Sequence, residues 1–150
     1  MTQDFHKFWL KISAIVIGSF APVMFLGSMS ATAAPLQFTL DLLGLPLDGL
    51  PVYGDDASRF LAAIMGGLLL GWGATIWCLQ AWVYDAAPDG VRRTVLTGFC
   101  VWFVLDSAGS VLSGHASNVL FNIGILALAV GPLWRPARAV AARSTWPPTA

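Results

Sequence analysis

Four long stretches that are nearly free of charge constrain this chain more than any other feature. They cover residues 12–34, 60–83, 94–112 and 116–134, and only Asp106 interrupts them with a charged side chain. Each is close to the roughly 20 residues that a helix needs to cross about 30 Å of hydrocarbon. A helix also satisfies its own backbone polar groups inside a bilayer. The sequence therefore predicts an all-α integral membrane protein with four transmembrane helices.

The composition supports a membrane environment and argues against several partners. Of 150 residues, 57% are hydrophobic and 11% are charged, which is too apolar for a soluble domain of this length. Eight acidic residues balance eight basic ones, so the net charge does not indicate nucleic-acid binding. We expect membrane lipids as the main partners, with no nucleic acid.

The links between the apolar stretches predict their arrangement. The turns at 86–90 and 113–117 are short, so the second, third and fourth stretches should be sequential antiparallel neighbours in one bundle. Residues 35–59 form a longer, Pro- and Gly-rich outer loop. We interpret residues 1–134 as one four-span membrane domain and residues 135–150 as a flexible, basic, Pro-rich cytoplasmic tail.

The positions of lysine and arginine predict the orientation. Positive residues near span ends favour the cytoplasmic side. Seven of the eight basic residues fall on one side of the predicted topology, and only Arg59 falls on the other. These seven are Lys7, Lys11, Arg92, Arg93, Arg135, Arg138 and Arg143. We therefore expect both termini in the cytoplasm and the chain in a bacterial-type inner membrane.

Two segments leave alternatives open. The first stretch ends in the small residues SATAA and could be a signal peptide cleaved near Ala33 or Ala34, which would leave three spans. Its apolar run is longer than a usual signal core and contains Pro22, so we favour an uncleaved span. The outer stretch 36–45 fits either a short interfacial helix or a surface loop fixed by prolines.

Small residues in the second stretch indicate a packing face. Ala63, Gly67 and Gly71 recur every four residues, which places them on one stripe of a helix. Such a stripe lets a neighbouring backbone approach closely in a membrane. We expect it to pack within the bundle, with a homodimer seam as the alternative.

Asp106 is the centre of the candidate site. It lies six residues before the end of its span, about 9 Å below the outer interface at 1.5 Å per residue. A charged side chain at the centre of a membrane helix costs roughly 2.5–3.5 kcal/mol on an insertion scale. We therefore expect Asp106 to face the bundle and other polar groups. The side chains that helical spacing could bring to it are Ser110, His115, Asn118 and Asn122.

Two interpretations of this set remain open. Arg59 is the only basic residue on the outer side, and its long side chain could form a structural ion pair with Asp106. Alternatively, Arg59, Asp106 and their polar neighbours line a small pocket that opens to the outer leaflet. Singly, Asn118 is explained by helix capping, His115 by a solvated turn and Asn122 by contact between helices.

The sequence favours binding over catalysis. It has no nucleophile elbow and no metalloprotease motif, which argues against a hydrolase. Cys78 and Cys100 lack nearby soft ligands, so we predict no metal site. We also predict no cofactor. We expect a non-catalytic binding or accessory subunit for a lipid, quinone or small amphiphile. The alternatives are a proton-coupled small-molecule transporter working as a homodimer and a lipid-modifying membrane enzyme. Partnership in a homodimer or larger membrane complex is left open.

Overall fold

The structure is a computed structural model that describes residues 1–47 and 53–137. Within these residues it contains five α-helices and no strand. The long helices are α1 (Gln3–Gly27), α3 (Asp56–Cys78) and α4 (Pro88–Leu112). The shorter ones are α2 (Ala34–Gly44) and α5 (Asn118–Val130). The predicted all-helical class is confirmed for the described residues, and the tail residues 138–150 lie outside them.

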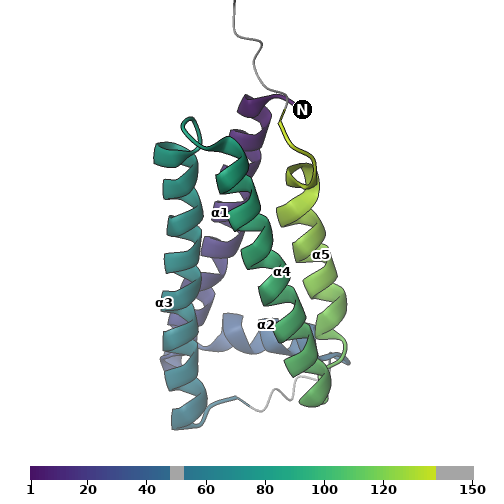
Figure 1. The fold of residues 1–150 in the computed structure, drawn as a ribbon. Helices are drawn as coiled ribbons and strands as arrows, with labels where there is room; N and C mark the ends of the chain where they lie inside the picture. The colour runs from purple at the N-terminus through teal and green to yellow at the C-terminus, as the bar shows by residue number, and fades with distance from the viewer. Residues whose placement is uncertain (48–52, 138–150) are drawn as a thin grey trace, which may run out of the picture.

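Short irregular helices connect and extend these elements. A 3-10 turn, η1 (Ser30–Thr32), leads into α2, and a π-helix, η2 (Leu79–Val83), continues α3. A 3-10 helix, η3 (Gly131–Trp134), extends α5. Figure 1 shows α1, α3, α4 and α5 running side by side in alternating directions. The start of α1 and the end of α5 therefore lie at one end of the bundle, and α2 crosses the other end (Figure 1).

Three segments are long and apolar enough to cross a membrane. They are Gln3–Gly27, Asp56–Val83 and Pro88–Leu112, and the apolar segment Asn118–Trp134 is shorter. Ile15, Leu68, Leu105 and Leu120 are each at least 60% exposed, although they lie on four different helices. A surface of this kind suits lipid better than water. The membrane class predicted from the sequence is thus supported by both length and surface.

Of the two alternatives for residues 36–45, the helical one is confirmed. Pro35 lies in the first turn of α2, where its missing N–H costs nothing. Leu36 is 1% exposed and packs so closely on Gly27 that an added Cβ at position 27 would overlap the Leu36 side chain. Phe38, two residues on, is exposed. One side of α2 therefore anchors it to the end of α1.

The closest helix contact joins α1 and α3, but through different small residues from those predicted. An added Cβ on Gly73 would lie 2.8 Å from the Ala14 carbonyl oxygen. One on Gly66 would lie 3.3 Å from the Ala21 carbonyl oxygen, which is also on α1. The prediction that the stripe Ala63, Gly67 and Gly71 packs within the bundle was wrong, because Gly67 and Gly71 face open space and Ala63 is exposed. Small residues occur around much of α3, so their spacing alone did not fix which stripe faces α1.

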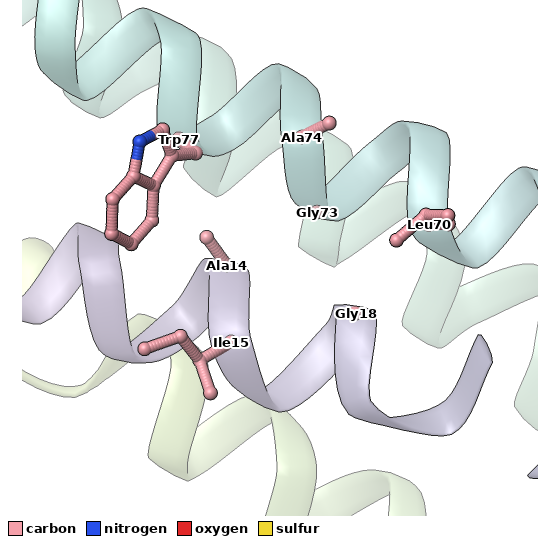
Figure 2. Close-up of a pocket in the computed structure, with 7 residues that line it drawn as sticks. All are labelled: Ala14, Ile15, Gly18, Leu70, Gly73, Ala74 and Trp77. Carbon is pink, nitrogen blue, oxygen red and sulfur yellow. The ribbon is translucent and has the colours of Figure 1, made fainter. Parts of the chain in front are cut away.

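The remaining contacts tie the other helices together. The Trp72 ring of α3 packs on Phe99 of α4 with ring centroids 4.9 Å apart. On α1, Trp9 donates its indole N–H to the Leu128 carbonyl at 2.8 Å. Beside Gly73, an open apolar hollow of about 200 Å³ lies between α1 and α3, flanked by Gly18 and Trp77 (Figure 2). Its lining carries no charged or hydrogen-bonding groups apart from the Trp77 indole.

Candidate functional site

Asp106 on α4 lies toward the start of α5. Its Oδ1 atom is 3.4 Å from Ser110 Oγ and 3.5 Å from Asn118 Nδ2. The Asn118 amide also donates to Ser110 Oγ at 2.9 Å. Ser110 is buried because it follows Asp106 by one helical turn on the face that meets α5. The structure therefore brings together three of the residues that the sequence selected.

A second contact extends this set along the two helices. Asn122 is 2% exposed and donates from Nδ2 to Ser107 Oγ at 3.2 Å. Asn118 and Asn122 are one turn apart on α5, so both amides face α4. We call this group the α4–α5 polar cluster, consisting of Asp106, Ser107, Ser110, Asn118 and Asn122. Ser107 is a member that the sequence reasoning did not select.

His115 lies beside this cluster in the turn between the helices. Its Nδ1 atom is 3.3 Å from Ser113 Oγ, and the tautomer of the ring decides which atom donates. His115 is exposed, and its ring lies 3.6 Å from where a Cβ on Gly44 would be. Ser117 donates to the Leu43 carbonyl at 2.7 Å. The end of α2 therefore contacts the turn that holds His115.

Arg59 is engaged elsewhere. Its guanidinium forms an ion pair with Asp56, three residues earlier on α3. Within residues 1–47 and 53–137, no salt bridge joins Arg59 to Asp106. Asp56 is 97% exposed, so this pair forms without removing the carboxylate from solvent. The structure thus supplies a local partner in place of the expected long-range one.

The helix start beside Arg59 is fixed by hydrogen bonds. Asp55 precedes α3 and accepts a hydrogen bond from the Ser58 backbone N–H at 2.8 Å. Hydrogen bonds from the side chain and backbone of Ser58 lower the pKa of Asp55 below its usual value. This arrangement is an N-terminal cap, so it explains the acidic residues here structurally.

The α4–α5 polar cluster offers a carboxylate, two hydroxyls and two amides for hydrogen bonding. Asp106 meets only neutral donors, at the long end of hydrogen-bond distances, and its second oxygen has no hydrogen bond to another described residue. In the described part of the chain, no carboxylate orients His115, and no three metal-ligating side chains come together. Cys78 and Cys100 are free thiols. The cluster can therefore accept hydrogen bonds from a ligand hydroxyl or amine.

A second group of buried polar side chains, which was not predicted from the sequence, lies at the opposite end of the bundle. His6, Gln80, Tyr84 and Arg92 are each at most 9% exposed. A signal for His6 was present, because His6, Leu10 and Ile17 recur at helical spacing on the apolar face of α1. The burial of Tyr84 and Arg92 depends on packing between distant segments, which no local pattern reveals.

Comparisons with known proteins give no family assignment. No family model, no curated protein and no solved structure matches this chain. The function must therefore be argued from the chemistry of the sites.

Proposed function

We propose that this chain is a four-span inner-membrane protein that binds a lipid, quinone or small amphiphile at the α4–α5 polar cluster without catalysing a reaction. In this account it is a binding or accessory subunit, and the cluster faces the outer leaflet. The ligand places a hydroxyl or amine against Asp106 and its apolar part along the neighbouring helix surface. Asn118 and Ser110 hold the carboxylate in place.

The alternating helix directions support this topology. They bring Lys7, Arg92 and Arg135 to one end, in agreement with cytoplasmic termini. The fourth crossing is Asn118–Val130 continued by Gly131–Trp134, with 13 and 4 residues. At the rises of α- and 3-10 helices these residues extend about 27 Å, close to the thickness of the hydrocarbon.

The main support for the proposal is the burial of Asp106 and the neutral character of its hydrogen-bond partners. It is partly buried, and its contacts within the described chain are the neutral groups of Ser110 and Asn118. An ionisable group inside a membrane span is costly, so it marks a functional site by default. A ligand donor at the free carboxylate oxygen would offset part of that cost.

The same observation favours proton-coupled transport as a second candidate. Asp106 is an acidic group inside a span, and no salt bridge among the described residues pairs it with a cation, so in this alternative it is the proton carrier. Transport by so small a chain would require a homodimer. The exposed Gly67 and Gly71 leave one side of α3 open to a second copy.

The test compares what co-purifies with the full-length protein and with Asp106→Asn. Mild-detergent extracts of both are analysed for bound lipid and quinone by mass spectrometry. We expect a molecule at near-stoichiometric amount in the unmodified chain and at least tenfold less in Asp106→Asn. Asp4→Asn, an exposed aspartate at the other end, is the matched control and should keep the ligand. Equal amounts in all three proteins would contradict the proposal.

The oligomeric state distinguishes a transporter from a binding subunit. A dimer in mild detergent, with substrate-driven proton uptake into vesicles that is lost in Asp106→Asn, would favour transport. A monomer that retains the ligand would favour a binding subunit.

A further inference from the structure

A small cavity lies at the end of the bundle where the N-terminal residues of α1 meet the start of α4. Its volume is about 160 Å³. Its polar lining comes from Gln3, His6, Tyr84, Asp89 and Arg92. Pro136, near the end of the described chain, also lines it. Three segments that are distant in the sequence therefore contribute to one cavity.

Two aromatic polar side chains in this lining are buried without hydrogen bonds. His6 and Tyr84 are both 0% exposed, and their rings meet edge to face at 6.5 Å. Neither imidazole nitrogen nor the phenol oxygen has a hydrogen-bond partner among the described residues. The carbonyls of Pro132 and Arg135 lie near the imidazole but outside hydrogen-bond geometry. Buried polar groups left unpaired are costly, so they indicate a missing partner.

Arg92 presents a fixed positive charge to the same cavity. Its Nε donates to Asp89 Oδ1 at 2.8 Å, and another guanidinium nitrogen donates to the Leu133 carbonyl at 3.2 Å. The cavity also lies at the first turn of α4, where Pro88 follows a residue that provides no side-chain cap. The free backbone N–H groups of a helix start favour an anion.

The charges around the cavity are positive in excess. The segments 1–7, 84–93 and 133–137 carry Lys7, Arg92, Arg93 and Arg135 against Asp4, Asp85 and Asp89. Asp89 is shared between Arg92 and Arg93, and Lys7 pairs with Asp85.

We propose that this cavity binds the phosphate group of an anionic ligand. His6 and the Tyr84 hydroxyl donate to the phosphate oxygens, and Arg92 and the start of α4 supply positive charge. The volume is about five times that of one water in the liquid, which suits a single phosphate better than a whole phospholipid headgroup. The phosphate belongs either to a lipid, whose glycerol remains outside, or to free inorganic phosphate.

This site is independent of the proposed function. It lies at the end of the bundle opposite α2, whereas the α4–α5 polar cluster adjoins α2. Loss of binding at one site therefore leaves binding at the other measurable, and the two proposals can fail separately.

The experiment measures binding to the full-length protein in a zwitterionic detergent at pH 7. The probes are inorganic phosphate, short-chain phosphatidylglycerol and short-chain phosphatidylcholine, with sodium chloride at matched ionic strength as the blank. Saturable binding of phosphate identifies a free anion as the ligand. Binding of phosphatidylglycerol without binding of phosphate identifies a lipid source. Binding of neither, or equal binding of phosphatidylcholine, would overturn the proposal.

Three variants assign the binding to the cavity. Tyr84→Phe removes only an unpaired hydroxyl and should fold, yet it should weaken binding about tenfold or more, because hydrogen bonds to charged groups are strong. His6→Gln should have a similar effect. Lys11→Gln is the control, because Lys11 lies over the Trp77 ring, outside the cavity lining and outside the charged segments around it, and it should change Kd less than twofold. Unchanged binding in Tyr84→Phe, or a larger loss in Lys11→Gln, would refute the assignment.

Discussion

The amide of Asn118 lies 2.9 Å from the hydroxyl of Ser110, and this contact closes the start of α5 onto α4. The same amide nitrogen lies 3.5 Å from Asp106, so one side chain joins the carboxylate and the hydroxyl that follows it on α4. A partly buried network of this kind helps to fix the positions of its members, because each would otherwise lose its partner. The position of Asp106 therefore depends on the packing of α4 against α5.

The first prediction concerns this contact. Ser110→Ala and Asn118→Ala should each lower the free energy of unfolding by about 1 kcal/mol. Because the two side chains touch, the double variant should lose less than the sum, with a coupling of about 0.6 kcal/mol. Equilibrium unfolding in mixed micelles measures both quantities.

Ser19→Ala is the control for this cycle, because the only bond of the Ser19 hydroxyl to another described residue is to the Val16 carbonyl of its own helix. It should show no coupling to Asn118→Ala. Strict additivity between Ser110 and Asn118 would mean that the contact does not exist in the membrane protein.

The second prediction separates two stripes of α3 that look alike in the sequence. Gly73→Ala should lower the free energy of unfolding by about 1–3 kcal/mol, because its Cβ would lie 2.8 Å from the Ala14 carbonyl and 3.1 Å from the Gly18 nitrogen. Gly71→Ala meets open space and should be neutral or stabilising by up to about 1 kcal/mol. Thermal unfolding of the two variants side by side gives the comparison.

The reverse order, with Gly71→Ala the more damaging, would show that α3 presents this stripe to another chain. In that case the loss should depend on protein concentration, because a dimer would be affected.

The third prediction concerns the contact between α1 and α5. The Ser13 hydroxyl is 1% exposed and lies 3.0 Å from both the Ala129 carbonyl and the Trp9 carbonyl of its own helix. Ser13→Ala should cost about 1 kcal/mol of unfolding free energy, and Ser13→Val more, because the extra methyl groups do not fit. A stabilised Ser13→Val would indicate that α5 packs elsewhere.

The fourth prediction is a pH dependence. Burial, followed by the neighbouring Asp85 charge, raises the pKa of Tyr84 above its usual value. The phenol is then protonated in the folded chain at a pH where the unfolded chain loses its proton. Stability from this source is present below about pH 10 and falls as the pH rises from there toward the raised pKa.

The measurement is the tyrosinate absorbance of Tyr53→Phe during alkaline titration, because the chain has only two tyrosines. The remaining Tyr84 signal should appear above the pH at which the denatured chain titrates. A midpoint equal to that of the denatured chain would mean that Tyr84 is exposed to water.

Much of the helical architecture could be predicted because the bilayer requires long apolar stretches. The runs that contain Ile15, Leu68 and Leu105 were found by length alone. The last run was predicted to end at residue 134, but α5 ends at Val130 and the next residues form a tighter helix that includes Pro132. Proline lacks the N–H that an α-helix would use there.

The face that each helix presents was harder to predict. Spacing along α3 permitted two stripes, and only contact with Ala14 on α1 selects Gly73 over Gly71. Helical spacing did bring Asp106, Ser110 and Asn118 together, because a short turn limits how α4 and α5 can meet. A distant ion pair with Asp106 was one of two interpretations considered for Arg59, although Asp56 was available one turn away.

The most direct test of the central claim uses a photoactivatable amphiphile bound to the full-length protein in membranes. If the α4–α5 polar cluster binds such a molecule, the crosslinks should concentrate in peptides that span residues 106–122 and should fall at least tenfold in Asp106→Asn. Crosslinks spread evenly over lipid-facing positions such as Leu68 and Ile15, with no change in Asp106→Asn, would contradict the account.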